Sequence, residues 1–157
     1  MKPTHAADPA QWLALDRQLC FALYAASLAM TKTYKPLLAP LGLTYPQYLV
    51  MLVLWEGDGI PVSQLGARLT LDSGTLTPLL KRLQTLGLLQ RQRDAADERR
   101  VLLHLSPAGK RLRAQALAVP QTMACATACD LQQLGQLTAQ LSALRHRLND
   151  SLSRAAA

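Results

Sequence analysis

The sequence predicts a mainly α-helical chain with one small β-hairpin, and three observations support this. Leucine and alanine dominate a composition that is 50% hydrophobic, and both residues favour helices over sheets. Aromatic residues, which are typical of strands, make up only 4% of the chain. Apolar residues also recur at spacings of three and four over most of the length, as they do on one face of a helix.

The 157 residues suit one domain, or one domain with dimerisation arms. Residues 1 to about 9 look like a loose end without the apolar segment of a signal peptide. No apolar run approaches the roughly 18 residues that span a bilayer. We therefore expect a cytoplasmic protein with no membrane partner. Thiols are kept reduced in that compartment, so three cysteines predict no lasting structural disulfide.

Three helices are predicted in the first part of the chain. Apolar positions recur at helical spacing from Gln11 to about Lys32. The stretch KPLLAPLG (35–42) predicts a short second helix that Gly42 ends. Residues 43–59 predict a third helix that opens at Thr44 and closes at glycines. Because this third helix is apolar on nearly every side, we expect it to form the buried centre of the domain.

A helix–turn–helix arrangement is predicted next. Ser63 is predicted to cap a short helix that ends near Leu69. After a short turn, Asp72 or Ser73 caps a second helix, which Gly87 ends. This second helix is expected to bury its leucines, which are Leu76, Leu79, Leu80, Leu83 and Leu86.

A β-hairpin is predicted after these helices. LLQRQR and VLLHLS are strand-like, and the polar segment DAADER between them is too charged to pack in a core. The complete unit is a winged helix-turn-helix with the recognition helix at about 72–86 and the wing at about 88–105.

The C-terminal part predicts further helices and a dimer. Ser106 caps a helix with Pro107 in its first turn, and Pro120 should kink or break that helix. Leucines then form one apolar stripe, at positions Leu131, Leu134, Leu137, Leu141, Leu144, Leu148 and Leu152. We expect a homodimer in which the terminal helices interlock. Residues 10–45 and 107–155 would then form a helical dimerisation region beside a winged domain at 46–106.

Positive charge is concentrated in the winged unit. Ten of the 17 Lys and Arg lie between Arg68 and Arg113, with only four acids, so this segment carries most of the net charge of +7. A basic face inside a folded domain favours a nucleic-acid partner, here double-stranded DNA. A solvated basic face is the alternative.

Candidate DNA-binding residues lie on the recognition helix and the wing. The polar face of the helix offers Asp72, Ser73, Thr75, Thr77, Lys81 and Arg82. The wing offers Arg91, Arg93, Arg99 and Arg100, which suit a narrow minor groove. We expect Asp97 to pair with a wing arginine and hold the tip in shape. An ordinary amphipathic helix and a solvated hairpin are the alternatives.

The cysteines permit two readings. Cys20 is either an inert core thiol or a reactive one. In the reactive case, tyrosine hydroxyls and a helix N-terminus could stabilise its thiolate. Cys125 and Cys129 would share one face of a helix if their segment is helical. With His146 they form a less favoured alternative, a zinc site, and we expect no resident metal and no cofactor.

The segment from Leu71 to Lys110 resembles the recognition helix and wing of MarR-type transcription regulators. It meets the motif D-x-R-x3-L-x-L-T-x-x-G with one change, since Ser106 replaces the threonine. The resemblance extends from about Leu13 to Leu152. The branch that fits best is the organic hydroperoxide resistance regulator, two-cysteine type. It shares the stretches LCFALY, YKPLL and LTYPQYLVMLVLWE, which stand here at 19–24, 34–38 and 43–56.

This resemblance implies roles for particular residues. Cys20 would be the peroxide-sensing thiol, and Tyr34 and Tyr45 of the partner chain would hydrogen-bond to it. Tyr24 and Phe21 would line the same pocket and favour an apolar hydroperoxide. Cys125 of the other subunit would resolve the oxidised Cys20 as an intersubunit disulfide. Cys129 has no assigned role.

The leading hypothesis is a transcriptional repressor and not an enzyme. A reduced dimer would bind a pseudo-palindromic operator, and an organic or lipid hydroperoxide would release it by oxidising Cys20. One alternative is a MarR-type repressor that a non-covalent aromatic ligand releases. Another is a thiol peroxidase, but such an enzyme has no use for a wing, and no basic residue stands next to Cys20 in the sequence.

Overall fold

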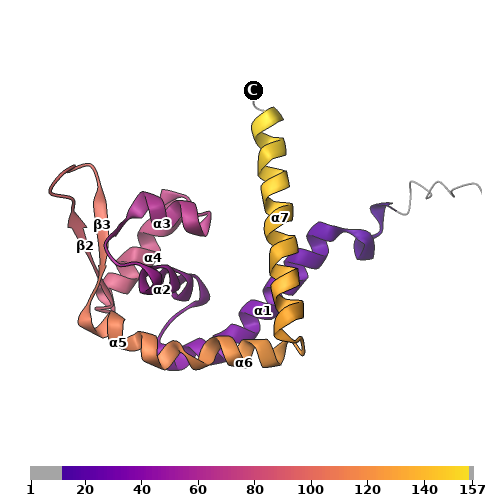
Figure 1. Ribbon diagram of the computed structural model, residues 1–157, viewed down its shortest axis with the longest axis horizontal. Helices are drawn as coiled ribbons and strands as arrows, with labels where there is room; N and C mark the ends of the chain where they lie inside the picture. The colour runs from indigo at the N-terminus through magenta and orange to yellow at the C-terminus, as the bar shows by residue number, and fades with distance from the viewer. Residues whose placement is uncertain (1–11, 156–157) are drawn as a thin grey trace, which may run out of the picture. The chain divides into compact units, whose positions relative to one another are not determined.

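The computed structural model describes residues 12–155, and the chain divides into two compact units, residues 1–116 and 117–157. The first unit contains helices α1 to α5 and the three strands. Figure 1 labels these helices and the strands β2 and β3. The second contains α6 and α7. The structure is mainly helical with one small sheet, which confirms the predicted fold class. The predicted loose end at residues 1 to about 9 lies outside the described residues.

Helix α1 (Leu19–Leu38) replaces the first two predicted helices. Its start at Leu19 is later than the predicted one, and the short 3-10 turn η2 (Leu15–Arg17) precedes it. The prediction of a separate helix at 35–42 was wrong, because Pro36 lies inside the last turn of α1. At that position proline removes one hydrogen bond, and its fixed φ is already helical. A second 3-10 turn, η3 (Ala39–Leu41), ends at Gly42, whose φ is +66°.

Helix α2 (Tyr45–Glu56) forms the buried centre of the first unit, as predicted. Thr44 caps it in a capping box with Gln47, so two backbone N–H groups of the first turn are satisfied. Its buried side chains are Gln47, Tyr48, Val50, Met51, Val53 and Leu54. Helices α1, α3, α4 and α5 and strand β3 all contact α2.

The helix-turn-helix consists of α3 (Val62–Leu69) and α4 (Ser73–Thr85). Asp72 caps α4, and Gly87 follows it with a φ of +70°, as predicted. Ser63 was wrongly predicted as a cap. Strand β1 leads directly into α3 at Val62 and leaves Ser63 in the first turn of the helix.

One expectation about the α4 core also fails. Leu76, Leu80 and Leu83 are buried and Leu79 is half-buried, but Leu86 is 40% exposed. Leu86 is the residue that ends α4, so it no longer continues the apolar face of the helix.

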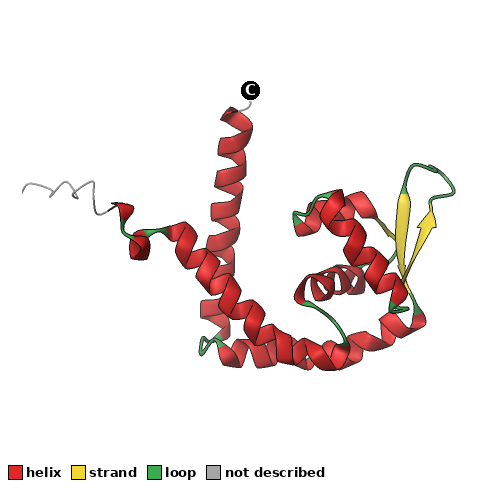
Figure 2. Ribbon diagram, turned by 180° about the vertical axis from the view of Figure 1, so that it is seen from behind, coloured by secondary structure: helices red, strands yellow, loops and turns green. Residues whose placement is uncertain are grey.

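The sheet has three antiparallel strands in the order β1–β3–β2. Strands β2 (Leu89–Arg93) and β3 (Val101–Leu105) form the predicted hairpin, with Leu89 opposite Leu105 and Arg93 opposite Val101. Figure 2 shows them side by side with a long loop joining their ends. Strand β1 (Ile60–Pro61) adds a short edge that periodicity did not predict, because two residues carry no alternation.

Helix α5 (Pro107–Ala116) begins as predicted, since the Ser106 hydroxyl accepts the N–H of Gly109 at 3.0 Å. The helix is then interrupted by a turn at Leu117, before α6 (Ala118–Ala126) begins. Pro120 lies in the first turn of α6, and its missing N–H explains the break that was predicted there.

Helix α7 (Leu131–Ala155) carries the leucine stripe. No residue of this described helix is buried in the single chain, and five stripe leucines are exposed by 48 to 83%. Among residues 12–155, no single helix has the length and apolarity to cross a bilayer. One pair of segments meets that test when the two are taken together. It consists of Leu19–Leu41 (α1 with η3) and the largely buried α2, which are bent by 67° relative to each other.

Candidate DNA interface and thiol site

The N-terminal end of α4 is organised around the Asp72 carboxylate. One oxygen accepts the backbone N–H of Thr75 and the other its hydroxyl, both at 2.9 Å. The Thr75 N–H contributes most to lowering the pKa of Asp72, followed by the hydroxyl. Asp72 therefore remains an anionic cap at neutral pH and fixes Thr75.

The polar face of α4 lies outside the core. The predicted residues on this helix are all exposed, namely Asp72, Ser73, Thr75, Thr77, Lys81 and Arg82. The Thr77 hydroxyl donates to the Ser73 carbonyl at 2.7 Å, and the residue is exposed. This exposed end, with small polar side chains and backbone N–H groups, is the kind of surface that approaches base edges and phosphates.

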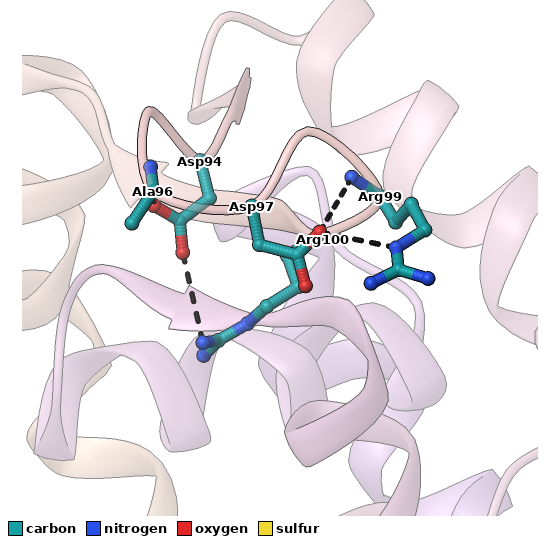
Figure 3. Close-up of polar contacts among 5 residues, drawn as sticks. All are labelled: Asp94, Ala96, Asp97, Arg99 and Arg100. Carbon is teal, nitrogen blue, oxygen red and sulfur yellow. Dashed lines mark hydrogen bonds and ion pairs between the residues drawn. The ribbon is translucent and has the colours of Figure 1, made fainter.

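The wing loop is held by two acid–arginine pairs (Figure 3). Asp97 accepts the backbone N–H of Arg99 at 3.1 Å and its Nε at 3.3 Å, as expected for a wing arginine. Asp94 lies 3.7 Å from the Arg100 guanidinium and accepts the Ala96 N–H at 2.9 Å. The acids thus shape the loop, while the Arg99 side chain stays 93% exposed.

Arg91 is fixed against the recognition helix. Its Nε donates to Oε1 of Gln84 at 2.8 Å, so strand β2 and helix α4 present one continuous polar surface. A cavity of about 270 Å³ opens here, and Thr77, Arg91, Arg99 and Arg100 contribute to its wall. The structure thus brings the α4 face and three of the four predicted wing arginines together. Arg93, the fourth, ends β2 and is exposed.

Cys20 is the second residue of α1, and its thiol is exposed and free in the single chain. Backbone N–H groups in the first turn of a helix have no intrahelical acceptors and favour a nearby anion. Tyr24 follows one turn later and is 61% exposed, and Phe21 is 38% exposed. The structure therefore excludes the reading of Cys20 as a core thiol buried within its own chain.

Tyr34 and Tyr45 form a ring pair with centroids 4.6 Å apart, at the junction of α1 and α2. Burial raises the pKa of both, and the neighbouring Tyr45 and Tyr48 raise that of Tyr34 further. The two phenols are therefore protonated at physiological pH. A protonated phenol is a hydrogen-bond donor for an anion.

The tyrosine pair lies far from Cys20 of the same chain. Cys20 and Tyr34 stand 14 residues apart on the continuous helix α1, which corresponds to about 21 Å at 1.5 Å per residue. A phenol cannot span that distance, so Tyr34 is unable to contact its own Cys20.

Cys125 and Cys129 lie in the second unit and do not share a helix face. Helix α6 ends at Ala126, and Ala128 has a φ of +53°, so Cys129 follows a left-handed turn. The condition that their segment is helical is therefore not met. Both thiols line a largely apolar cavity of about 890 Å³ together with Pro120 and Leu131. Cys125 is exposed and Cys129 half-buried.

Two contacts near the wing base were missed from the sequence. The Trp55 indole Nε1–H donates to the Gly109 carbonyl at 2.9 Å, and Asp58 accepts the Leu105 N–H at 2.7 Å. Their partners are 54 and 47 residues away along the chain. The glycine in the D-x-R-x3-L-x-L-T-x-x-G pattern was the one signal that could have indicated a close approach at Gly109.

Comparison with known proteins agrees with this architecture. A family model described as the transcriptional regulator SarA/Rot matches residues 32–115. The chain belongs to this family of MarR-type winged-helix transcriptional regulators. The relatives that match this chain are transcriptional regulators rather than enzymes, which confirms the prediction of a regulator.

Two relatives are similar over most of the chain. The organic hydroperoxide resistance transcriptional regulator of Bacillus subtilis is 47% identical over 135 residues, covering 86% of this chain and 92% of that protein. The HTH-type transcriptional regulator TtmR of Methylorubrum extorquens is 48% identical over 135 residues, covering 86% and 69%. The chain is thus a transcriptional regulator homologous to the organic hydroperoxide resistance regulator.

AbfR of Staphylococcus epidermidis is a similar solved structure. It is 31% identical with a TM-score of 0.75, covering 90% of this chain and 97% of that one. Reduced AbfR bound to DNA superposes with a TM-score of 0.72 and 30% identity over 88% and 98% of the chains. AbfR with a disulfide formed gives a TM-score of 0.60 at 34% identity over 86% and 95%.

Proposed function

We propose that this regulator is a repressor whose reduced homodimer binds a pseudo-palindromic operator and is released by organic or lipid hydroperoxides. The observation that carries the proposal is the 14-residue separation of Cys20 from Tyr34 on one helix. The phenols of Tyr34 and Tyr45 are donors suited to a thiolate, but only a second copy of the chain could bring this pair to Cys20. The 47% identity to the hydroperoxide resistance regulator supports the same reading.

Exposed apolar surface supports the dimer. Helix α1 buries only Leu38 within the chain, although it is rich in apolar residues. Leu19, Tyr24, Leu28 and Met30 on α1 are exposed by 44 to 61%, and the α7 leucines are exposed as well. Such surfaces are typical of helices that pack against another subunit. In this proposal residues 10–45 and 107–155 are the dimerisation region and residues 46–106 the DNA-binding domain.

The proposed chemistry uses thiols alone. The Cys20 thiolate attacks the peroxide O–O bond, takes up one oxygen as sulfenic acid and releases the alcohol. The Cys125 thiol of the partner subunit then attacks the Cys20 sulfur, which forms the S–S bond and releases water. The 890 Å³ cavity beside Cys125 gives that thiol an open approach. Tyr24 and Phe21 provide apolar walls suited to an organic hydroperoxide.

The DNA contacts follow from the exposed α4 face and the wing. One recognition helix per subunit would enter the major groove, and the wing arginines would contact the flanking minor groove. Operator readout requires a fixed distance between the two winged units. A new covalent bond between subunits changes that distance and releases the DNA.

The test is operator binding by fluorescence anisotropy, with and without cumene hydroperoxide, for the wild type and Cys20→Ser. We expect peroxide to release the wild type and leave the variant bound. Continued binding by fully oxidised wild type would contradict the proposal. Release of Cys20→Ser by peroxide would do so too. If both proteins instead ignore peroxide and dissociate with phenolic compounds, the protein is a repressor released by a non-covalent aromatic ligand.

A further inference from the structure

A row of aromatic side chains leads away from the Tyr34–Tyr45 pair. The Tyr48 ring lies 6.0 Å from that of Tyr34, and the Trp55 ring lies 6.3 Å from Tyr48 in an edge-on arrangement. Tyr48 is only 2% exposed, so it fills the interior between the pair and the tryptophan. Tyr45, Tyr34, Tyr48 and Trp55 form what we call the aromatic row.

The far end of the aromatic row is bonded to the base of the wing. The Trp55 Nε1–H donates to the Gly109 carbonyl at 2.9 Å. Gly109 is pressed against the backbone where the wing begins, since a Cβ placed on it would stand 2.1 Å from the Leu88 carbonyl oxygen. Leu88 in turn donates its N–H to Leu83 in α4 at 3.0 Å, and its carbonyl accepts the Ser106 N–H at 3.0 Å. Trp55 thus reaches the point where recognition helix and wing meet.

Close packing makes this route mechanically direct. Interiors have few voids, so a buried ring cannot move without displacing its neighbours. A rearrangement of the Tyr34–Tyr45 pair on oxidation would therefore press on Tyr48 and then on Trp55. Because Gly109 has no space against Leu88, a shift of the indole that carried the Gly109 carbonyl with it would also displace Leu88. All of these residues belong to the first unit.

We propose that Tyr48 and Trp55 are positioning residues that couple the thiol-pocket tyrosines to the wing base. This inference rests on the proposed peroxide response and adds the path by which each winged unit senses it. Neither residue touches the peroxide or the DNA. Their effect is on the difference in operator affinity between the reduced and oxidised protein.

The decisive variant is Trp55→Phe in the full chain, which keeps an aromatic ring beside Tyr48 but removes the hydrogen bond to Gly109. We expect reduced Trp55→Phe to bind operator within about twofold of wild type. Sulfenic-acid trapping should show Cys20 oxidised at the wild-type rate. The loss of affinity on oxidation should be at least about tenfold smaller than in the wild type. Trp12→Phe, at the other tryptophan, which is 67% exposed, is the matched control and should be released normally.

The outcomes separate the two proposals. If Trp55→Phe is released like the wild type, the coupling role is overturned and the peroxide-responsive repressor stands. If wild-type Cys20 is not oxidised, or its oxidation releases no DNA, both fall.

A second measurement leaves the aromatic row intact. In Trp12→Phe, Trp55 is the single tryptophan, and its emission should shift when peroxide oxidises Cys20. The shift should be absent in Trp12→Phe/Cys20→Ser. Unchanged Trp55 emission after complete oxidation of Cys20 overturns the inference, even if Trp55→Phe fails to fold.

Discussion

The ring centroids of Tyr34 and Tyr45 lie 4.6 Å apart with the ring planes tilted by 38°, and Tyr34 stands 14 residues from Cys20 along α1. The pair is assembled within one chain, and in the proposed dimer it would donate hydrogen bonds to the Cys20 thiolate of the other subunit. A hydrogen bond to a charged group contributes about 1.5–3 kcal/mol. Tyr34→Phe and Tyr45→Phe should therefore each slow Cys20 oxidation by about tenfold. Stopped-flow kinetics with cumene hydroperoxide measures this, and equal rates in wild type and both variants would contradict the assignment.

Cys125 should be required for the covalent dimer, and Cys129 should not. After peroxide treatment, non-reducing electrophoresis should show a cross-linked dimer for the wild type and Cys129→Ser. Cys125→Ser should stay monomeric on the gel and proceed to sulfinic acid, because no thiol intercepts the sulfenic acid. The opposite pattern, with cross-linking abolished only in Cys129→Ser, would assign the resolving role to Cys129.

Arg99 should bind a DNA phosphate from the wing. Asp97 orients its backbone and Nε, and the side chain is 93% exposed. Arg99→Ala should weaken binding to all operator variants alike and lower the salt-dependence slope by about 1, because one phosphate is no longer neutralised. Arg145→Ala removes an exposed charge from α7 and should leave the slope unchanged. A titration of affinity against salt concentration compares the two, and equal slopes for both variants would remove Arg99 from the interface.

Asp58 should make the stability of the first unit pH-dependent. Its carboxylate is partly buried, which opposes ionisation. Hydrogen bonds from the Leu105 N–H, Lys110 and the Gly59 N–H nevertheless lower its pKa below the ordinary value of 3.8. A lowered pKa contributes stability above the unfolded value, and that stability is lost as pH falls through the folded value.

The test of the Asp58 contribution is urea unfolding of wild type and Asp58→Asn at several pH values. The wild type should be more stable by about 1 kcal/mol at pH 7, since a carboxylate one-third exposed is partly screened. The difference should begin to shrink as pH falls below about 4 and should be lost as pH falls through the lowered pKa of folded Asp58. A difference that does not change with pH would show that the hydrogen bonds act without the charge.

Gly109 and Gly135 should respond in opposite directions to alanine. A Cβ on Gly109 would stand 2.1 Å from the Leu88 carbonyl oxygen, whereas nothing lies within 4 Å of one on Gly135. Gly109→Ala should therefore lower the free energy of unfolding by about 3 kcal/mol. Gly135→Ala, in helix α7, should raise it by about 0.5–1 kcal/mol. Chemical denaturation of both variants measures the free energy of unfolding. A Gly109→Ala variant as stable as the wild type would show that the backbone around Leu88 can move to make room for the Cβ.

Local signals in the sequence determined most of the elements. The Thr44 capping box, the Asp72 cap and Gly87 after α4 each involve neighbours within a few residues, so their chemistry is visible in the chain itself. The helix-turn-helix, the hairpin, the buried α2 and the pairing of Asp97 with a wing arginine were predicted on that basis. The resemblance to hydroperoxide resistance regulators also came from short stretches, and the family match confirms the class of protein.

The tertiary structure decided the features that depend on distant partners. The helix predicted at 35–42 is not separate, because Pro36 lies inside the last turn of α1. Ser63 was displaced from the cap position because Ile60 and Pro61 pair with β3. Cys125 and Cys129 are separated by a turn that no spacing rule indicates.

The sequence by itself indicated candidate residues for both functions. Residue type and spacing indicated the DNA-binding candidates, and the resemblance to a known family indicated Cys20 as the peroxide sensor. Only the tertiary structure decided how they are connected. It places the Tyr34 ring beside that of Tyr45, with Tyr34 about 21 Å from Cys20 along α1, and it joins Trp55 to Gly109 across 54 residues. Contacts between residues so far apart in the chain depend on how helices and strands pack, and no local pattern records that packing.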